Sequence, residues 1–183
     1  MTGAEEITEI VRRSLENLTT PMVASRREWT SDVKAALGAA GRAHGYWVCA
    51  GGLPRDSAAA DSGEWLYDLC WLSYQPGGDE FLVDAHLVVE SEWTGGEYLD
   101  EDFQKLLLAR ATVRLMIFDG GNPAGADQTA SRLARQVAAF RCTREDDTWL
   151  FAAWVTSDSE RGWSFRWYTI RQGEAVLLVA SGG

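Results

Sequence analysis

Three acidic residues in two neighbouring apolar segments are the residues best placed to do chemistry in this sequence. Asp68 lies among apolar residues within segment 64–74, and Glu90 and Glu92 close segment 81–93. Side chains alternate along a β-strand, so Glu90 and Glu92 leave their segment on one face. Carboxylates that meet repel each other unless a cation joins them, and their oxygens suit hard divalent ions. We expect Mg²⁺ or Mn²⁺ to bind if Asp68 reaches the other two acids.

The turn between the two segments decides what lies opposite Asp68. Residues 75–79 contain proline and two glycines, which favours an antiparallel hairpin. A turn centred near Asp79 places Asp68 across from Glu90, with β-carbons about 5 Å apart, whereas a turn centred near Gly77 places it across from His86. The sequence leaves both registers open. Strict alternation predicts that the residues at even positions from 84 to 92, His86 included, share one face.

The elements that must position these acids follow from hydrophobic periodicity. We predict helices over residues 4–18, 31–43, 98–110 and 127–140, with Thr30 or Ser31 capping the second. We predict strands over 46–50, 64–74, 81–93, 112–118, 148–156, 163–171 and 175–180. A central hairpin followed by one helical crossover predicts an α/β (α+β) fold, with a mixed sheet flanked by helices and extended by antiparallel C-terminal strands.

The bulk composition limits the setting in which the protein works. One domain over residues 1–183 suits the length, with a core over about 26–118 that residues 125–181 extend. No secretory signal and no membrane-spanning run is present, so we expect a cytoplasmic protein that does not contact a membrane. Cys49, Cys70 and Cys142 are expected to be reduced core residues. The net charge of -10 disfavours nucleic acid as a partner unless a metal or a local basic group compensates.

The order of these features resembles the core of the PD-(D/E)XK (restriction-endonuclease-like) nuclease superfamily. A helix and a strand are followed by a strand with Asp68, a strand with Glu90-Ser91-Glu92, a helix and a buried strand, over about residues 26–118. The resemblance implies that Asp68 and Glu90 bind the metal and that the backbone carbonyl of Ser91 is a further ligand. The superfamily usually has lysine where this chain has Glu92. Some members carry it on the following helix instead, where Lys105 is the candidate.

The same resemblance suggests accessory residues and an activity. Glu28 resembles the superfamily's acid of the first helix, and the aromatic residues Trp29 and Trp93 adjoin the acids as candidate ligand contacts. The implied reaction is metal-assisted hydrolysis of a phosphodiester, in which Lys105 or Glu92 orients water or neutralises developing charge. The alternative is an inactive relative that binds proteins or self-associates. If the protein is an active nuclease, the carboxyl oxygens should converge in an open cleft. If it is an inactive relative that binds proteins, the site should be closed and an aromatic patch should be exposed elsewhere.

Each candidate also has a purely structural interpretation. Asp68 can form an ion pair with Arg26, Arg27 or Arg114, and Lys105 or the acids of segment 81–93 can simply be solvated surface residues. A thiol nucleophile built from Cys70, His86 and Asp68 lacks any local signature.

The C-terminal strands offer one further interpretation. Trp163, Phe165 and Trp167 alternate along one strand, which would give a surface for homo-oligomer formation if that face is exposed.

Overall fold

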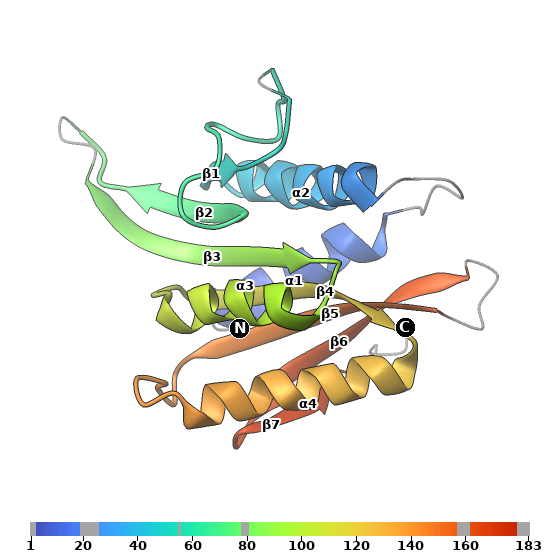
Figure 1. Cartoon of the computed structure of the whole chain (residues 1–183). Coiled ribbons are helices and arrows are strands. Elements are labelled where there is room, and N and C mark those ends of the chain that lie inside the picture. The colour runs from blue at the N-terminus through green and yellow to red at the C-terminus, as the bar shows by residue number, and fades with distance from the viewer. Residues whose placement is uncertain (1–2, 19–25, 55, 78–80, 157–161, 179–183) are drawn as a thin grey trace.

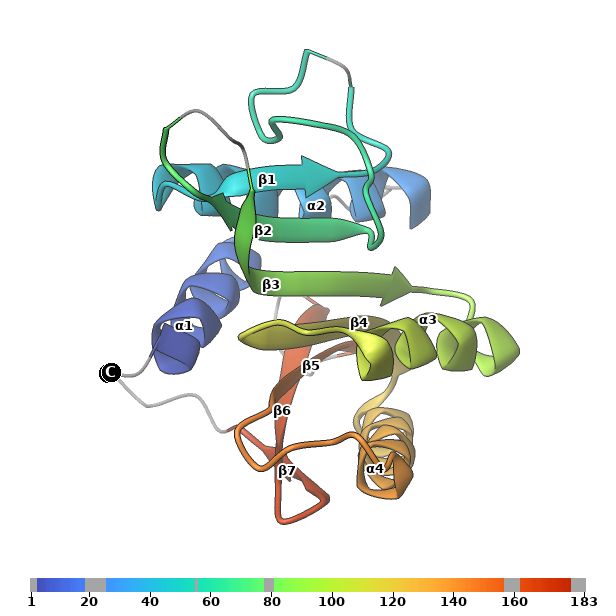
Figure 2. The ribbon, with the colours of Figure 1, turned by 90° about the vertical axis from the view of Figure 1, so that its left-hand side faces the viewer.

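A seven-stranded mixed sheet with helices on both faces forms the body of the molecule, in the order β1-β2-β3-β4-β5-β6-β7 (Figures 1 and 2). The structure is a computed structural model, and it describes residues 3–18, 26–54, 56–77, 81–156 and 162–178. The predicted fold class is confirmed. None of the helices in these ranges is long and apolar enough to cross a bilayer.

The first three strands form an antiparallel meander, and the next two run parallel to β3. The strands are β1 (Trp47–Ala50), β2 (Leu69–Tyr74), β3 (Leu82–Glu92), β4 (Val113–Gly121), β5 (Thr148–Thr156), β6 (Trp163–Arg171) and β7 (Glu174–Leu177). β3 pairs parallel with β4, and β4 pairs parallel with β5, while β6 and β7 return antiparallel. The prediction of one crossover was therefore wrong, because two helices connect parallel strands. The predicted bounds of the fifth and sixth strands match the observed ones.

The helices divide into two pairs that cover opposite faces of the sheet. They are α1 (Gly3–Glu16), α2 (Arg26–Ala43), α3 (Gly96–Leu108) and α4 (Pro123–Ala139). Buried residues of α1 and α2 join Val89, Leu115 and Ala152 in one hydrophobic cluster. Buried residues of α3 and α4 join Val88 and Met116 in the other. Alternate residues of the central strands therefore face the two clusters, as period-2 alternation requires.

All four helices begin earlier than predicted, and in α2 and α4, where the difference is five and four residues, a local cause is visible. In α2 the buried Trp29 lies four residues before Val33, which lies four before Leu37, so the apolar stripe already exists upstream of Thr30. In α4 the side chain of Asn122 accepts a hydrogen bond from the Gly125 amide, and the helix starts at Pro123. Asparagine before proline is a strong helix-start signal that the periodicity of α4 alone does not show.

β2 is shorter than predicted, which moves Asp68 from the middle of a strand to its entrance. Residues 64–68 are not paired as a strand, and Trp65 and Leu66 are exposed. The Asp68 carbonyl instead accepts a hydrogen bond from the Gly51 amide, 3.0 Å away. The apolar residues before Asp68 thus predicted a buried strand where the chain forms a surface loop.

A β-bulge places His86 on the face opposite to the predicted one. The register between β2 and β3 shifts between Trp71 and Leu72, and an extra residue in one strand reverses the alternation beyond it. Consequently Ala85 packs with the cluster of α3 and α4, whereas the His86 ring lies 4.6 Å from the ring of Tyr46 on the other side. His86 also hydrogen-bonds to Ser73 Oγ at 2.9 Å, so its observed contacts are structural.

Two further expectations about exposure were wrong. Phe165 and Trp167 pack beneath α1 and α2, where Trp29 stacks on Phe165 with ring centroids 6.2 Å apart, so this face of β6 is occupied by the chain's own helices. Only Trp163 of the predicted surface is markedly exposed. Among the cysteines, Cys49 and Cys70 are buried, but Cys142 is exposed.

Candidate functional site

The strand entrance at Asp68 and the strand end at Glu90 meet on the α3 side of the sheet. The nearest observed pair is Leu69 with Val89, which is the register of a turn centred on Asp79 at this end of the hairpin. Asp68 therefore lies beside Glu90, and the alternative in which it faces His86 is wrong. The negative charge of Asp68 acts on the Glu90 carboxyl group, which shows that the two groups are electrostatic neighbours.

The Asp68 carboxylate is held by three hydrogen bonds. Oδ2 accepts from the Ser91 amide at 2.9 Å and from Ser91 Oγ at 2.7 Å. Oδ1 accepts from Lys34 Nζ at 2.7 Å. A carboxylate offers about four acceptor positions, so one position remains for another ligand. Asp68 is thus fixed in orientation while part of its coordination capacity is retained.

Lys34 was missed by sequence reasoning. It lies within α2, is 8 % exposed, and forms a partly buried ion pair with Asp68. The expected arginine partner Arg114 instead pairs with Asp147 at 3.0 Å, and the side chains of Arg26 and Arg27 lie outside the described ones. Asp68 therefore does form an ion pair, as its structural interpretation expected, but the partner is a lysine and not an arginine.

Glu90 is the most unusual acid of the site. It is 2 % exposed, and its Oε1 makes no hydrogen bond within the described part of the chain. Burial, followed by the negative charge of Asp68, raises the pKa of Glu90 to about 8. Desolvation penalises the charged form of a buried acid, and a neighbouring like charge adds to that penalty. Glu90 is therefore poised to exchange its proton near neutral pH or to bind a cation.

Lys105 is the cation next to Glu90. Its Nζ lies 3.5 Å from Glu90 Oε1 and donates a 2.7 Å hydrogen bond to Asp102 Oδ1 one turn earlier in α3. The 3.5 Å contact is an ion pair rather than a well-formed hydrogen bond. The hydrogen bond to Asp102, followed by the charge of Glu90, raises the pKa of Lys105. A lysine on the helix after β3 thus reaches Glu90.

Both lysines of the chain converge on this site. The sequence has 17 lysine and arginine residues, of which only Lys34 and Lys105 are lysines. One contacts Asp68 and the other contacts Glu90. A lysine ammonium is a compact point charge that changes its proton affinity readily when buried, unlike a guanidinium. The scarcity of lysine elsewhere was a signal available in the sequence.

The other predicted residues lie at the rim or in the core. The Glu92 carboxylate accepts a hydrogen bond from the Thr94 amide. Glu28 is exposed on α2 and lines a cavity of about 600 Å³ together with Lys34. Trp29 is buried, and Trp93 is partly buried against the α1 and α2 cluster. Neither tryptophan shows an exposed ring for stacking a ligand.

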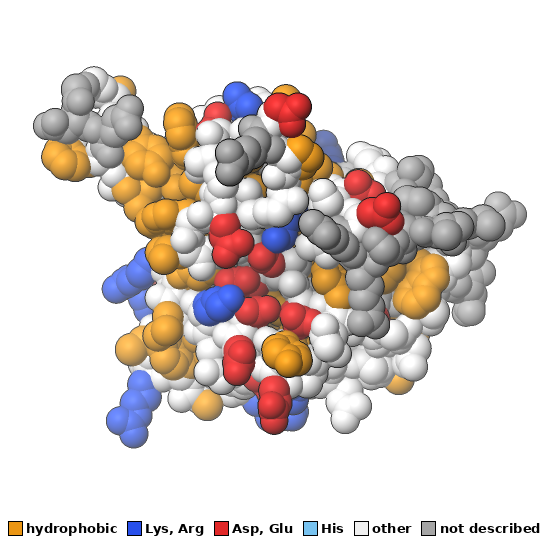
Figure 3. Space-filling model, turned by 45° about the horizontal axis from the view of Figure 1, so that its top comes forward, with side chains coloured by type: hydrophobic (Ala, Val, Ile, Leu, Met, Phe, Trp, Pro, Cys, Tyr) orange, Lys and Arg blue, Asp and Glu red, His pale blue; other side chains and the backbone are white. Residues whose placement is uncertain are grey.

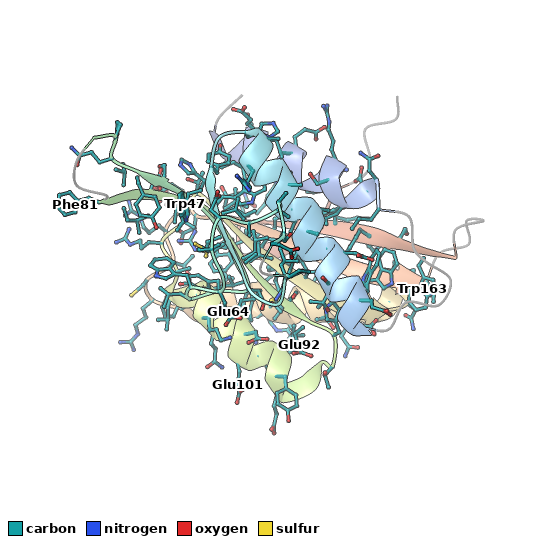
Figure 4. All side chains as sticks on the ribbon, turned by 90° about the horizontal axis from the view of Figure 1, so that it is seen from above. Trp47, Glu64, Phe81, Glu92, Glu101 and Trp163 are labelled. Atoms are coloured by element: carbon teal, nitrogen blue, oxygen red, sulfur yellow. The ribbon has the colours of Figure 1, made fainter. Side chains whose placement is uncertain are left out.

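The surface around the site is strongly acidic. Acidic side chains gather around a few basic ones on the face that Figure 3 presents. Figure 4 shows Glu64, Glu92 and Glu101 on the α3 side of the molecule. The Glu64 side chain packs against the α-carbon of Gly51, where a β-carbon would clash with it. This surface favours cations over free polyanions.

The donor set fits one hard divalent cation only in part. Within the described residues, no three His, Cys, Asp or Glu side chains are grouped as ligands of one metal ion. Two neighbouring carboxylates are present, one with a buried oxygen that lacks a hydrogen bond and one with an acceptor position left. Mg²⁺ commonly binds through one or two carboxylates and keeps several waters or substrate oxygens. Asp68 and Glu90 therefore offer two carboxylates that suit such an ion, and its other ligands would be water or substrate oxygens.

Comparisons of this chain with protein-family models, with curated proteins and with solved structures find no match. The functional argument consequently rests on the site itself.

Proposed function

We propose that the protein is a metal-dependent hydrolase of phosphodiester bonds in nucleic acid, with Asp68 and Glu90 as its metal ligands. The observation that carries the proposal is the buried Glu90 carboxyl group, which lies beside Asp68, has an oxygen without a hydrogen bond, and is 3.5 Å from Lys105. A buried acid with a strongly raised pKa beside a second acid is typical of catalytic and metal sites.

The observed order of the elements is compatible with the proposal. The order α2, β1, β2, β3, α3, β4 is the order of the PD-(D/E)XK core that the sequence resembles. Asp68 enters the second strand and Glu90 lies near the end of the third. In this proposal Lys105 on the next helix, 3.5 Å from Glu90, takes the role of the lysine that is absent at Glu92. These placements agree with the superfamily's distribution of site residues.

Each residue of the site then has a task. Bound metal would supply an activated water and polarise the phosphodiester. Ser91 and Lys34 fix the orientation of the Asp68 carboxylate through both of its oxygens. Lys105 holds positive charge beside Glu90, where it stabilises negative charge that develops on the substrate.

A cleavage assay on the full chain tests the proposal. Supercoiled plasmid, single- and double-stranded oligonucleotides and RNA are incubated with Mg²⁺, Mn²⁺ or a chelator. We expect metal-dependent cleavage by the wild type, loss of cleavage in Glu90→Gln and Asp68→Asn, and full cleavage by the control Asp146→Asn, which alters an exposed acid. Glu90→Gln is the decisive variant. Burial of the charged Glu90 carboxylate opposes folding, so a loss of cleavage in this variant is not explained by a loss of a stabilising charge.

A protein-binding module without hydrolytic activity is the second candidate. It is favoured by the closure of the site at Glu90 and by exposed aromatic residues on the β2–β3 hairpin, Tyr74 and Phe81. The same assay separates the candidates. Absence of cleavage with every substrate and either metal supports the binding module, and equal cleavage by wild type and Glu90→Gln refutes the assigned site.

A further inference from the structure

The β2–β3 hairpin extends beyond the rest of the sheet as an arm. We define the arm as residues 73–77 and 81–86. Pairing of β1 with β2 stops at Trp47 and Leu72, and pairing of β4 with β3 starts at Val113 and Leu87. Beyond these pairs the Thr112 amide still donates to the Ala85 carbonyl at 2.9 Å, and from Asp84 outward β3 has only β2 as a strand partner within the described chain. Figure 1 shows this ribbon curving away from the body, and Figure 4 places Phe81 far out along it and Trp47 at its base.

The arm exposes several large apolar side chains. Phe81 is 62 % exposed and Val83 is 65 % exposed. Leu82, which pairs with Tyr74, is also exposed, and Val83 lies at a second register shift, between the pairs Leu82–Tyr74 and Asp84–Ser73. At the base the exposed ring of Trp47 contacts that of Tyr74 edge to face. A two-stranded ribbon with this many exposed apolar side chains is at best marginally stable in water by itself.

One backbone edge of the arm is also free of a strand partner. β3 pairs with β2 on one side, but within the described chain no strand pairs with the other side of Leu82–Asp84. By contrast, the outer edge of β1 is covered by the loop that follows it, because the Val48 amide donates to the Asp61 carboxylate and the Ala50 amide donates to the Ser62 carbonyl. Edge strands that are left uncovered and apolar invite pairing with another strand.

We propose that the arm is the site at which two copies of this chain associate, through antiparallel pairing of residues 82–84 of β3 in both copies. Antiparallel pairing of identical segments about a two-fold axis is self-complementary, so each copy offers the same surface to the other. The two sheets then join along these edges. Phe81, Val83 and their neighbours on each arm cover the exposed apolar side chains of the other arm.

The size of the apolar surface agrees with a dimer. Side chains of this type bury about 150–250 Å² each when fully covered, so the exposed parts of Trp47, Tyr74 and three residues near the tip expose roughly 450 Å². Two copies bury about twice this area before backbone atoms are included, close to the ~1,000 Å² expected of a specific interface. One copy alone would leave a patch as large as the largest on a typical monomer.

The chemistry of the arm favours protein over nucleic acid as its partner. Residues 73–77 and 81–86 contain no lysine or arginine, and Asp84 is their only carboxylate. Without positive charge the arm has no attraction for phosphates. The chain's net charge of -10 opposes the approach of two copies, but this repulsion is screened beyond about 8 Å at physiological salt.

Light scattering coupled to size exclusion tests this proposal on the full chain. We expect the wild type to become a dimer as its concentration is raised to about 100 µM, because association follows mass action. Val83→Lys should raise the dimer dissociation constant on the order of 100-fold, because lysine on an edge strand blocks pairing. Leu177→Lys is the matched control, since Leu177 is 37 % exposed on β7, at the opposite edge of the sheet from the arm. It should leave the dimer intact.

Two results would overturn the proposal. One is a wild type that stays monomeric over the whole concentration range, and the other is a Val83→Lys variant that dimerises as tightly as the wild type. Circular dichroism separates loss of pairing from loss of fold, because Val83 is exposed and its replacement should leave the thermal midpoint unchanged. The test is independent of catalysis, so failure of the cleavage assay does not decide it.

Discussion

The ammonium group of Lys105 lies 3.5 Å from Oε1 of the buried Glu90 carboxyl group. Helix α3 brings the two together by packing Leu99, Phe103 and Leu106 against the sheet, which sets Lys105 at the border of the buried face. The lysine is half exposed and the acid is buried. Solvent can therefore reach the ammonium group of Lys105, whereas it hardly reaches the carboxyl group of Glu90.

Replacement of Lys105 by glutamine should impair activity much more than stability. Lys105 is a half-exposed residue, so its loss should change the free energy of unfolding by less than about 1 kcal/mol. If it neutralises developing charge on the substrate, cleavage should fall by about 10²–10³-fold. Arg110→Gln, which removes a charge just beyond the same helix, should keep normal cleavage. Equal rates for wild type and Lys105→Gln would remove Lys105 from the mechanism.

Stability should fall as pH rises through the titration of Glu90. Burial and the Asp68 charge raise the pKa of Glu90 from 4.5 to about 8. Between these values the folded chain binds more protons than the unfolded one, so this contribution is complete below the lower value and is lost by the upper one. The slope should approach ~1.4 kcal/mol per pH unit at most.

Urea denaturation of the wild type and of Glu90→Gln at several pH values measures this effect. The difference in free energy of unfolding between the two proteins should move in favour of the variant as pH rises, and then level off above the pKa of Glu90. A difference that does not vary with pH would mean that Glu90 titrates normally in the folded state.

The ion pair between Lys34 and Asp68 should be strongly coupled. Each partner is largely buried, so removing one leaves the other uncompensated. We expect Lys34→Met and Asp68→Asn each to cost about 2–3 kcal/mol, and the double variant to cost clearly less than their sum. A double-mutant cycle by chemical denaturation provides the coupling energy. Strict additivity would show that the pair contributes no mutual stabilisation.

Arg114 should be essential for folding rather than for activity. Its guanidinium donates to the carbonyl oxygen of Ala109 at the end of α3 and pairs with the buried Asp147. Loss of a buried charge partner typically costs 3–5 kcal/mol, so we expect about that loss in Arg114→Met. The exposed pair of Arg144 with Asp146 provides the control, and Arg144→Met should cost under ~0.5 kcal/mol. Similar thermal midpoints for both variants would contradict this account.

Much of the fold could be predicted because its strands and helices differ clearly in period. The bounds of β5 and β6 follow from apolar and aromatic runs that end at turn residues. The start of β2 could not be found, because Trp65 and Leu66 are apolar yet exposed. The face of His86 could not be found either, because one bulge inverts the alternation and no residue type marks it.

The candidate site was predictable as a pair of acids but not as a network. Local alternation and one choice of register brought Asp68 to Glu90. Lys34 was not predictable from the pattern of α2, because its partner lies on a loop that is distant in sequence and approaches the helix only in the folded chain. Periodicity locates the buried stripe of a helix, but it does not indicate which charged residue next to that stripe finds a partner.

Calorimetric titration with Mn²⁺ tests the central claim most directly. Metal and proton compete for Glu90, so affinity should rise about tenfold per pH unit below pH ~8 and level off above it. Binding should be lost in Glu90→Gln and be unchanged in Asp146→Asn. Absence of Mn²⁺ binding by the wild type, or binding that Glu90→Gln leaves intact at every pH, would contradict the assignment of Asp68 and Glu90 as a metal site.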